Sequence, residues 1–246
     1  MAEIRIQKGL AESLARLAAP QESFGMPVDL PKLARSLGVT EIVMEELTED
    51  GRTIWDDRGP RIELRADRPE ARTRFTLAHE IAHVLIERDQ TVARRTQGLD
   101  HDEVETLCDW IAASILMPRD WVRRYAERSE YNLSLVRLVA RRADVSLSAA
   151  AVRLAEVGGR VCMLLRLQRA QRRWLIVGHA AVPREYHGTL ELTPESSLLI
   201  DNLANRRDTW QELSFTVPGQ VLPAHTHIDR SGDTCLALVT SLDPMK

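Results

Sequence analysis

The segment His79-Glu80-Ile81-Ala82-His83 constrains this chain most, because it sets two imidazoles and a carboxylate at the spacing of a hydrolytic metal centre. Residues four apart lie about one turn apart on the same face of an α-helix, so both rings can reach one ion. Residues 75–87 contain no Pro or Gly, which predicts that the segment is helical. Glu80 follows the first imidazole directly, where a carboxylate can hold a water molecule and take its proton. The alternative interpretation is a buried helix carrying two satisfied histidines.

Two histidines leave a catalytic zinc ion one protein ligand short, since such sites typically use three ligands and a water molecule. Glu105, 22 residues after His83 and on the next strongly helical segment, is the best candidate. Asp109 follows on the same helix face and can accept a hydrogen bond from the outer nitrogen of a ligating histidine. The competing ligands are Glu103 and His101, and the alternative interpretation of this acidic stretch is a solvated helix face.

Size and composition place the chain among soluble globular proteins, with 246 residues, 44% hydrophobic and 28% charged. No stretch approaches the ~20 apolar residues that span a bilayer, and the N-terminal residues do not resemble a signal peptide. The three cysteines are odd in number and widely spaced, which argues against a disulfide framework. We therefore expect a cytoplasmic protein without a membrane partner. Residues 1–118 hold 15 basic and 22 acidic residues, a balance that does not favour nucleic acid.

Periodicity and turn residues predict a mixed helix and strand order with a boundary near residues 158–159. Asp29 is expected to cap a short helix that Gly38 closes. A strand leading directly into the His79 helix could leave a free sheet edge beside the metal, where an extended peptide can add. The expected helices cover 4–17, 30–37, 102–116, 133–143 and 147–157, and the expected strands cover 41–45, 52–55, 61–66, 161–167, 174–181, 189–192 and 234–240.

Residues 74–83, RFTLAHEIAH, and residues 105–118, ETLCDWIAASILMP, together resemble the two signature blocks of the ImmA/IrrE family of metallo-endopeptidases. The resemblance runs roughly from residue 27 to residue 156. It implies zinc carried by His79, His83 and Glu105, with Glu80 as the general base. Ala82 stands where many members have Gly, and Ile111 replaces an aromatic residue. The 86 residues from Val161 match no part of the family pattern.

The resemblance implies an α+β fold with a zincin-like, gluzincin-type metallopeptidase domain over 1–118. A helical, helix-turn-helix-like extension is expected over 119–158, and a small strand-rich domain of unknown role over 159–246. The expected activity is zinc-dependent cleavage of a helix-turn-helix transcriptional repressor, which derepresses stress-response or mobile-element genes; Mn²⁺ and Fe²⁺ are the alternative metals. The rival hypothesis is a repressor-binding regulatory or toxin–antitoxin partner with a structural metal, which has no need of Glu80.

The predicted helix pair over 133–157, two short helices joined by a short turn, resembles a helix-turn-helix. It could touch DNA phosphates or dock on a repressor, but we favour a structural hairpin with solvated arginines, so direct DNA binding is not expected. The basic residues concerned are Arg137, Arg141, Arg142 and Arg153.

The donor that assists the metal in polarising a scissile carbonyl stays open between Tyr125, Tyr131, His101 and Arg74. His225 and His227 could join His179 or Cys235 at a second metal, but Pro218-Gly219 and Pro223 favour loop histidines. Cys108 is expected to pack as a small apolar residue without a redox role.

Overall fold

The computed structural model describes residues 2–19, 25–88, 93, 96, 98–159, 163–171, 173–181, 189–203 and 208–242, with the side chains of 2–7 and 241–242 left aside. The chain forms two compact units, which are described separately. The first consists of Met1–Trp121 with Arg141–Ser146, and the second of Val122–Ala140 with Leu147–Lys246.

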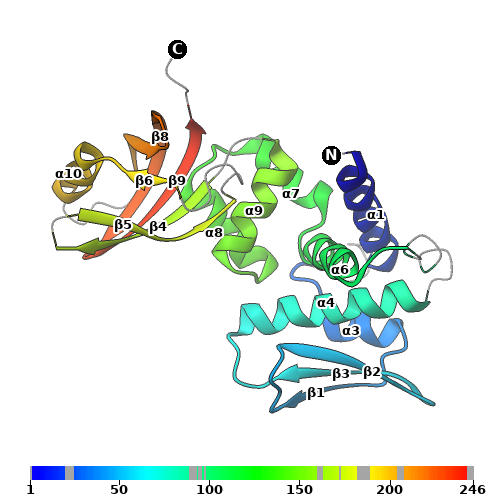
Figure 1. Cartoon of the computed structure of the whole chain (residues 1–246). Helices are drawn as coiled ribbons and strands as arrows, with labels where there is room; N and C mark the ends of the chain where they lie inside the picture. The colour runs from blue at the N-terminus through cyan, green and yellow to red at the C-terminus, as the bar shows by residue number, and fades with distance from the viewer. Residues whose placement is uncertain are drawn as a thin grey trace. The chain divides into compact units, whose positions relative to one another are not determined.

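The first unit combines a small sheet with a stack of helices (Figure 1). The sheet has the order β1-β3-β2, with β1 parallel and β2 antiparallel to β3. Helix α4 lies between this sheet and α6, and α1 packs on α6 (Figure 1). The elements are α1 (Ala2–Ala18), α3 (Leu30–Ser36), β1 (Glu41–Glu45), β2 (Gly51–Asp56), β3 (Gly59–Arg65), α4 (Glu70–Arg88) and α6 (His101–Leu116).

Alternation along β3 fixes which face of the sheet meets α4. Ile62 and Leu64 are buried, as the sequence predicts for a strand with one apolar face. Glu63 is buried as well, because the guanidinium groups of Arg52 and Arg61 pair with its carboxylate. Strand β2 ends the sheet order, so one of its edges has no strand partner among the described residues.

The predicted helix ends are confirmed by their caps. The Asp29 carboxylate accepts the backbone N–H of Lys32 at 2.9 Å, and Gly38 takes the left-handed conformation, φ +78°, just beyond α3. Helix α6 begins with a reciprocal capping box, in which Asp100 accepts the N–H of Glu103 and the Glu103 carboxylate accepts the N–H of Asp100.

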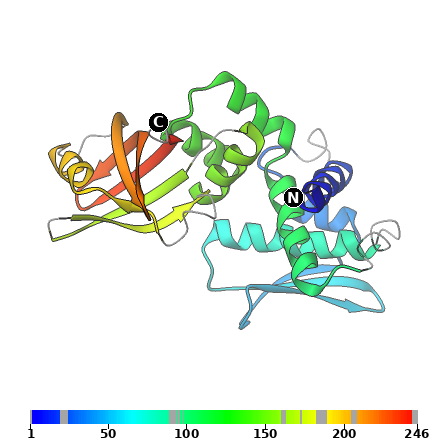
Figure 2. The same ribbon diagram turned by 45° about the horizontal axis from the view of Figure 1, so that its top comes forward.

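The second unit holds a short helical stretch and a six-stranded antiparallel sheet of order β5-β4-β9-β8-β7-β6. The terminal strands β5 and β6 approach each other, so the sheet curves into a near-barrel (Figure 2). Its apolar interior includes Leu165, Trp174, Leu213 and Phe215. The elements of this stretch of chain are α7 (Arg119–Arg128), α8 (Leu133–Ala143), α9 (Leu147–Gly158), β4 (Met163–Ala170), β5 (Arg173–Ala180), β6 (Glu191–Leu192), α10 (Pro194–Asn202), β7 (Thr209–Val217), β8 (Gln220–Ser231) and β9 (Thr234–Leu242).

The prediction that the C-terminal part of the chain is rich in strands is confirmed, but periodicity does not predict α7, α10, β7 or β8. The interpretation of His225 and His227 as loop residues is wrong, because both lie in β8. Pro223 is also part of this strand. Within the described residues, which end at 242, the pairing of β9 with β8 begins at Ala224, so the missing N–H of Pro223 breaks no described ladder hydrogen bond on that side.

No helix within the described parts of the chain combines the length and apolar character needed to cross a membrane.

Two glycine-to-alanine changes in the first unit should have opposite effects on its stability. A Cβ at Gly51 would lie 2.5 Å from Cγ2 of Thr76, so Gly51→Ala should wedge β2 away from α4 and cost about 1–3 kcal/mol. Gly9 lies in α1, and no described atom beyond its chain neighbours and its own helix backbone is within 4 Å of the added Cβ, so Gly9→Ala should stabilise by about 0.8–1 kcal/mol. Urea midpoints followed by tryptophan fluorescence measure both, and a stabilised Gly51→Ala variant would contradict the packing of β2 on α4.

Candidate metal centre

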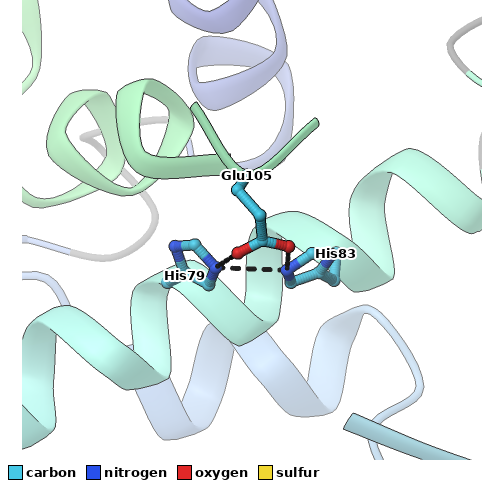
Figure 3. A group of neighbouring side chains, drawn as sticks. All are labelled: His79, His83 and Glu105. Atoms are coloured by element: carbon cyan, nitrogen blue, oxygen red, sulfur yellow. Dashed lines mark hydrogen bonds and ion pairs between the residues drawn. The ribbon is translucent and has the colours of Figure 1, made fainter. Parts of the chain in front are cut away.

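Two packed helices supply the three side chains that the sequence singles out as metal ligands. His79 and His83 are one turn apart on α4, and Glu105 projects from α6 toward both rings (Figure 3). The ligand atoms of these three residues lie within 4.8 Å of one another, and they form the one such group of three or more in the described parts of the chain.

The spacing of the ligand atoms of these three residues fits a single divalent cation. Nε2 of His79 is 3.1 Å from Oε2 of Glu105, Nε2 of His83 is 3.3 Å from Oε1 of Glu105, and the two Nε2 atoms are 3.1 Å apart. Zinc–ligand bonds of 2.0–2.2 Å in a tetrahedron separate neighbouring ligand atoms by about 3.3–3.6 Å, close to the distances found here. Two imidazoles and a carboxylate are also the donor set of a hydrolytic zinc site. The residues present therefore fit the metal that the family resemblance implies.

The outer nitrogens of both histidines are held by the same face of α6. Oδ1 of Asp109 accepts a hydrogen bond from Nδ1 of His79 at 2.9 Å, the contact that the sequence predicts for Asp109. The Sγ atom of Cys108 lies 3.6 Å from Nδ1 of His83. With a proton on its Nδ1, the neutral ring of His79 turns its Nε2 lone pair toward the Glu105 carboxylate, an arrangement that a cation or a proton stabilises.

The competing ligands do not join this group. Glu103 is occupied in the capping box of α6. His101 is 85% exposed, and its Nδ1 is 4.0 Å from Oε1 of Glu105. Glu105 lies about half a turn beyond Glu103 and one turn beyond His101, and its carboxylate reaches both rings at once.

The surroundings shift the pKa values of the two histidines in opposite directions. Burial lowers the pKa of His79, but the hydrogen bond and negative charge of Asp109, together with the charges of Glu80 and Glu105, raise that pKa above its ordinary value. Burial and the neighbouring His79 together lower the pKa of His83. In Glu80, burial raises the pKa of the carboxyl group, against the hydrogen bond from Thr53. A carboxylate with a raised pKa is the better proton acceptor near neutral pH.

Thr53 is a site residue that the sequence analysis missed. Its hydroxyl donates a hydrogen bond of 2.8 Å to Oε2 of Glu80, and it comes from the edge strand β2. No local signal marks this threonine, because the contact depends on which strand forms the edge beside α4. A cleft of about 530 Å³ opens at this place. Its lining includes Gly51, Arg52, Thr53 and Trp55 of β2, Arg72, Phe75, Thr76, His79, Glu80, His83 and Glu87 of α4, Glu105 and Asp109 of α6, and Asp50.

The candidate carbonyl-polarising residues lie elsewhere. Arg74 donates to the backbone oxygens of Val28 and Asp144 and pairs with the Asp144 carboxylate, so it ties segments of the first unit together. Tyr131, in the second unit, is buried and donates to the backbone oxygen of Leu154. Neither these two residues nor Tyr125 and His101 are among the described residues that line the cleft.

The strand β8 histidines have partners other than a metal. His225 stacks on Trp210 at 4.3 Å between ring centroids and contacts Glu212, whereas His227 meets the edge of the same indole. Neither belongs to a group of metal-binding side chains among the described residues. Cys108 and Cys235 are buried free thiols, and burial raises the pKa of Cys235 to about 12; Cys162 lies outside the described residues.

The arginines of the helix pair divide into two kinds. Arg137 pairs with Asp208 and Asp229, and Arg153 is buried and pairs with Glu156. Arg141 and Arg142 are exposed.

Two helices that hold two imidazoles and a carboxylate around one point, with a second glutamate beside the first histidine, define a metal centre of the peptidase type. Residues 32–155 match the family described as the IrrE N-terminal-like domain, a peptidase family. The chain belongs to this family.

Two curated relatives match part of this chain over part of their own length. The radiation response metalloprotease IrrE of Deinococcus deserti is 34% identical over 161 residues, which cover 60% of this chain and 55% of that protein. The protein of the same name from Deinococcus radiodurans is 38% identical over 96 residues, which cover 37% of this chain and 29% of that protein. The chain thus spans about half or less of these relatives.

A solved structure shares the fold more widely. A Mycobacterium tuberculosis transcriptional regulator superposes with a TM-score of 0.52 over 96% of this chain and 76% of that chain, at 14% identity. This similarity shows a common fold, and at this identity it carries no functional argument.

Replacing Asp109 with Asn should lower the pKa of His79 in the metal-free protein. The hydrogen bond and charge of Asp109 are the largest contributions that raise this pKa against burial, so losing the charge should move the pKa downward. Zinc affinity should also fall, by about 10- to 100-fold. Imidazole NMR titration of chelator-treated protein measures the pKa. Asp102→Asn, a change at an exposed residue on the same helix, is the control, and an unmoved His79 titration would contradict the assigned contact.

Proposed function

We propose that this chain is a zinc-dependent endopeptidase that cleaves a specific protein substrate, a helix-turn-helix transcriptional repressor. The observation that carries the proposal is the convergence of His79, His83 and Glu105 on one point with the Glu80 carboxylate buried beside it in an open cleft. In the finer fold assignment this is a zincin-like domain of the gluzincin type, in which a glutamate from a second helix completes the ligand set. The division into 1–118, 119–158 and 159–246 stays a prediction.

The residues of the cleft divide the chemistry between them. His79, His83 and Glu105 would hold the metal, for which zinc is proposed and Mn²⁺ and Fe²⁺ are the alternatives. When bound, zinc supplies Lewis-acid activation of water and of a carbonyl group. Thr53 occupies Oε2 of Glu80, so Oε1 is the oxygen assigned to take the proton of the attacking water and pass it to the leaving amine. Asp109 holds the His79 ring in the tautomer that leaves Nε2 free for the metal.

The edge of β2 gives an extended substrate a place to bind. This strand ends the sheet and lines the cleft, so its free backbone groups lie along the route to Glu80. Gly51, Thr53 and Trp55 share the strand face toward α4 because side chains alternate. Trp55 is 42% exposed there and offers an apolar surface to a substrate side chain. Strand addition would recognise the peptide mainly through its backbone.

The rival hypothesis, a repressor-binding partner with a structural metal, is disfavoured by Glu80. Burying a carboxylate costs free energy, and a structural metal site has no need of this one. The Glu80 side chain is nevertheless buried at the wall of the cleft, where Thr53 donates a hydrogen bond to it. Direct DNA binding is disfavoured because Arg137 and Arg153 are engaged in ion pairs within the protein. A role in derepressing stress-response or mobile-element genes follows only if the substrate is a repressor.

Glu80→Gln should keep zinc but lose about 10²- to 10⁴-fold in peptide cleavage, because the amide cannot accept the proton. The zinc-loaded chain is incubated with the helix-turn-helix repressor encoded beside its gene, with and without chelator, and fragments are identified by mass spectrometry. Glu70→Gln, at an exposed residue of the same helix that is not among the described residues lining the cleft, is the matched control and should cleave as the wild type does. Equal cleavage by Glu80→Gln would remove Glu80 from the mechanism, and an intact repressor with the wild type would refute this substrate.

Thr53→Val should lower kcat by about 10-fold or more with little change in KM, because a hydrogen bond to a charged group is worth about 1.5–3 kcal/mol. Valine keeps the shape of threonine, so β2 should retain its packing. Thr53→Ser keeps the hydroxyl and should restore most of the turnover. The same cleavage assay with both variants decides the point, and identical rates for valine and serine would show that the Thr53 hydroxyl does not orient Glu80.

A further inference from the structure

Cys108 makes a contact with the metal site to which the family pattern assigns no role. Its Sγ lies 3.6 Å from Nδ1 of His83. Residues 105, 108 and 109 share one face of α6, because positions three and four apart are neighbours on a helix, and this face meets α4. The metal ligand Glu105 and the two residues that touch the outer nitrogens of the histidines therefore form one surface.

We propose that Cys108 is a positioning residue whose sulfur accepts a hydrogen bond from Nδ1–H of His83 and so holds this ring in the tautomer whose Nε2 can bind a metal. The inference rests on the metal site of the proposed function and deepens it. It assigns to His83 the counterpart of the contact that Asp109 makes with His79.

The geometry excludes Cys108 as a fourth ligand. Nε2 of His83 faces the other ligand atoms, 3.1 Å from Nε2 of His79 and 3.3 Å from Oε1 of Glu105. The sulfur touches Nδ1, which lies on the other side of the ring. The thiol would therefore not take the position that a catalytic metal needs for a water molecule.

The direction of the hydrogen bond decides whether His83 can act as a ligand. A neutral imidazole carries one proton. If the thiol donated to Nδ1, the ring proton would stand on Nε2 and block the metal. If the sulfur accepts from Nδ1–H, the lone pair of Nε2 points at the site. The lone pair on Nε2 of His83 is therefore maintained by a sulfur acceptor at Nδ1.

A thiol suits this position better than a second carboxylate. Cys108 is fully buried, whereas the Asp109 side chain is 56% exposed and keeps its charge in contact with water. A buried carboxylate at position 108 would carry a large desolvation cost beside Glu80 and Glu105. Cysteine is compatible with burial and still offers a weak acceptor.

The first measurement is zinc affinity of the full chain by competition with a chromophoric chelator. Cys108→Val keeps an apolar side chain of similar size without an acceptor, and its affinity should fall about 10-fold, the lower end for lost outer contacts because sulfur is a weak acceptor. Cys108→Ser returns an acceptor and should bind zinc more tightly than the valine variant. Cys235→Ala removes the buried thiol of β9 and should bind zinc as the wild type does.

The second measurement separates positioning from packing. Imidazole ¹⁵N shifts of the metal-free full chain should show the Nδ1–H tautomer for His83 in the wild type and in Cys235→Ala, and a shift toward Nε2–H in Cys108→Val. Wild-type zinc affinity and tautomer in Cys108→Val would overturn the proposal, as would a valine-like serine variant.

The result is independent of peptidase activity. A wild type that binds zinc with the expected tautomers but cleaves no repressor would refute the proposed function and leave the role of Cys108 standing. Cleavage by the wild type with unchanged zinc affinity in Cys108→Val would refute the role of Cys108 alone.

Discussion

The packing of α6 across α4 is the contact on which the whole site depends. Helix α4 carries His79 and His83 one turn apart. The facing side of α6 carries Glu105, Cys108 and Asp109, which contact these two rings. Apolar residues on both helices, among them Ile81, Leu107 and Ile111, are fully buried and fix the approach of the two faces. Since a shift of about 1 Å is enough to misplace a catalytic group, the hydrophobic packing of this pair sets the precision of the polar site.

This packing concentrates electron-rich atoms at one point. The Nε2 atoms of His79 and His83 and both oxygens of Glu105 meet at 3.1–3.3 Å, so with both Nε2 atoms unprotonated their lone pairs repel, and a cation at this point stabilises the arrangement. In the absence of metal a proton can fill this role, which agrees with the raised pKa of His79. Zinc and protons therefore compete for the same lone pairs, so metal affinity must weaken as the pH falls toward the pKa of His79.

The sequence predicts those parts of the site that local periodicity controls. The spacing of His79 and His83 is a property of one helix, and the four-residue spacing of Glu105 and Asp109 puts both carboxylates on one face of the next helix. Thr53 could not be found in this way, because its contact with Glu80 requires knowing that β2 is the edge strand beside α4. The role of Cys108 escapes for a related reason: composition marks a buried thiol, but only the packed helices show which nitrogen it touches.

The helix pair of α8 and α9 resembles a DNA-binding motif in sequence, but its contacts can be seen only in the folded chain. Arg137 of α8 binds Asp208 and Asp229, and the backbone N–H of Leu133, at the start of α8, donates to Nδ1 of His227. These contacts tie the helix to the six-stranded sheet of its own unit. Burial lowers the pKa of His227, which keeps the ring neutral and able to accept that N–H. Arg137 and Arg153, half of the arginines that suggested a nucleic-acid surface, thus serve contacts within the protein.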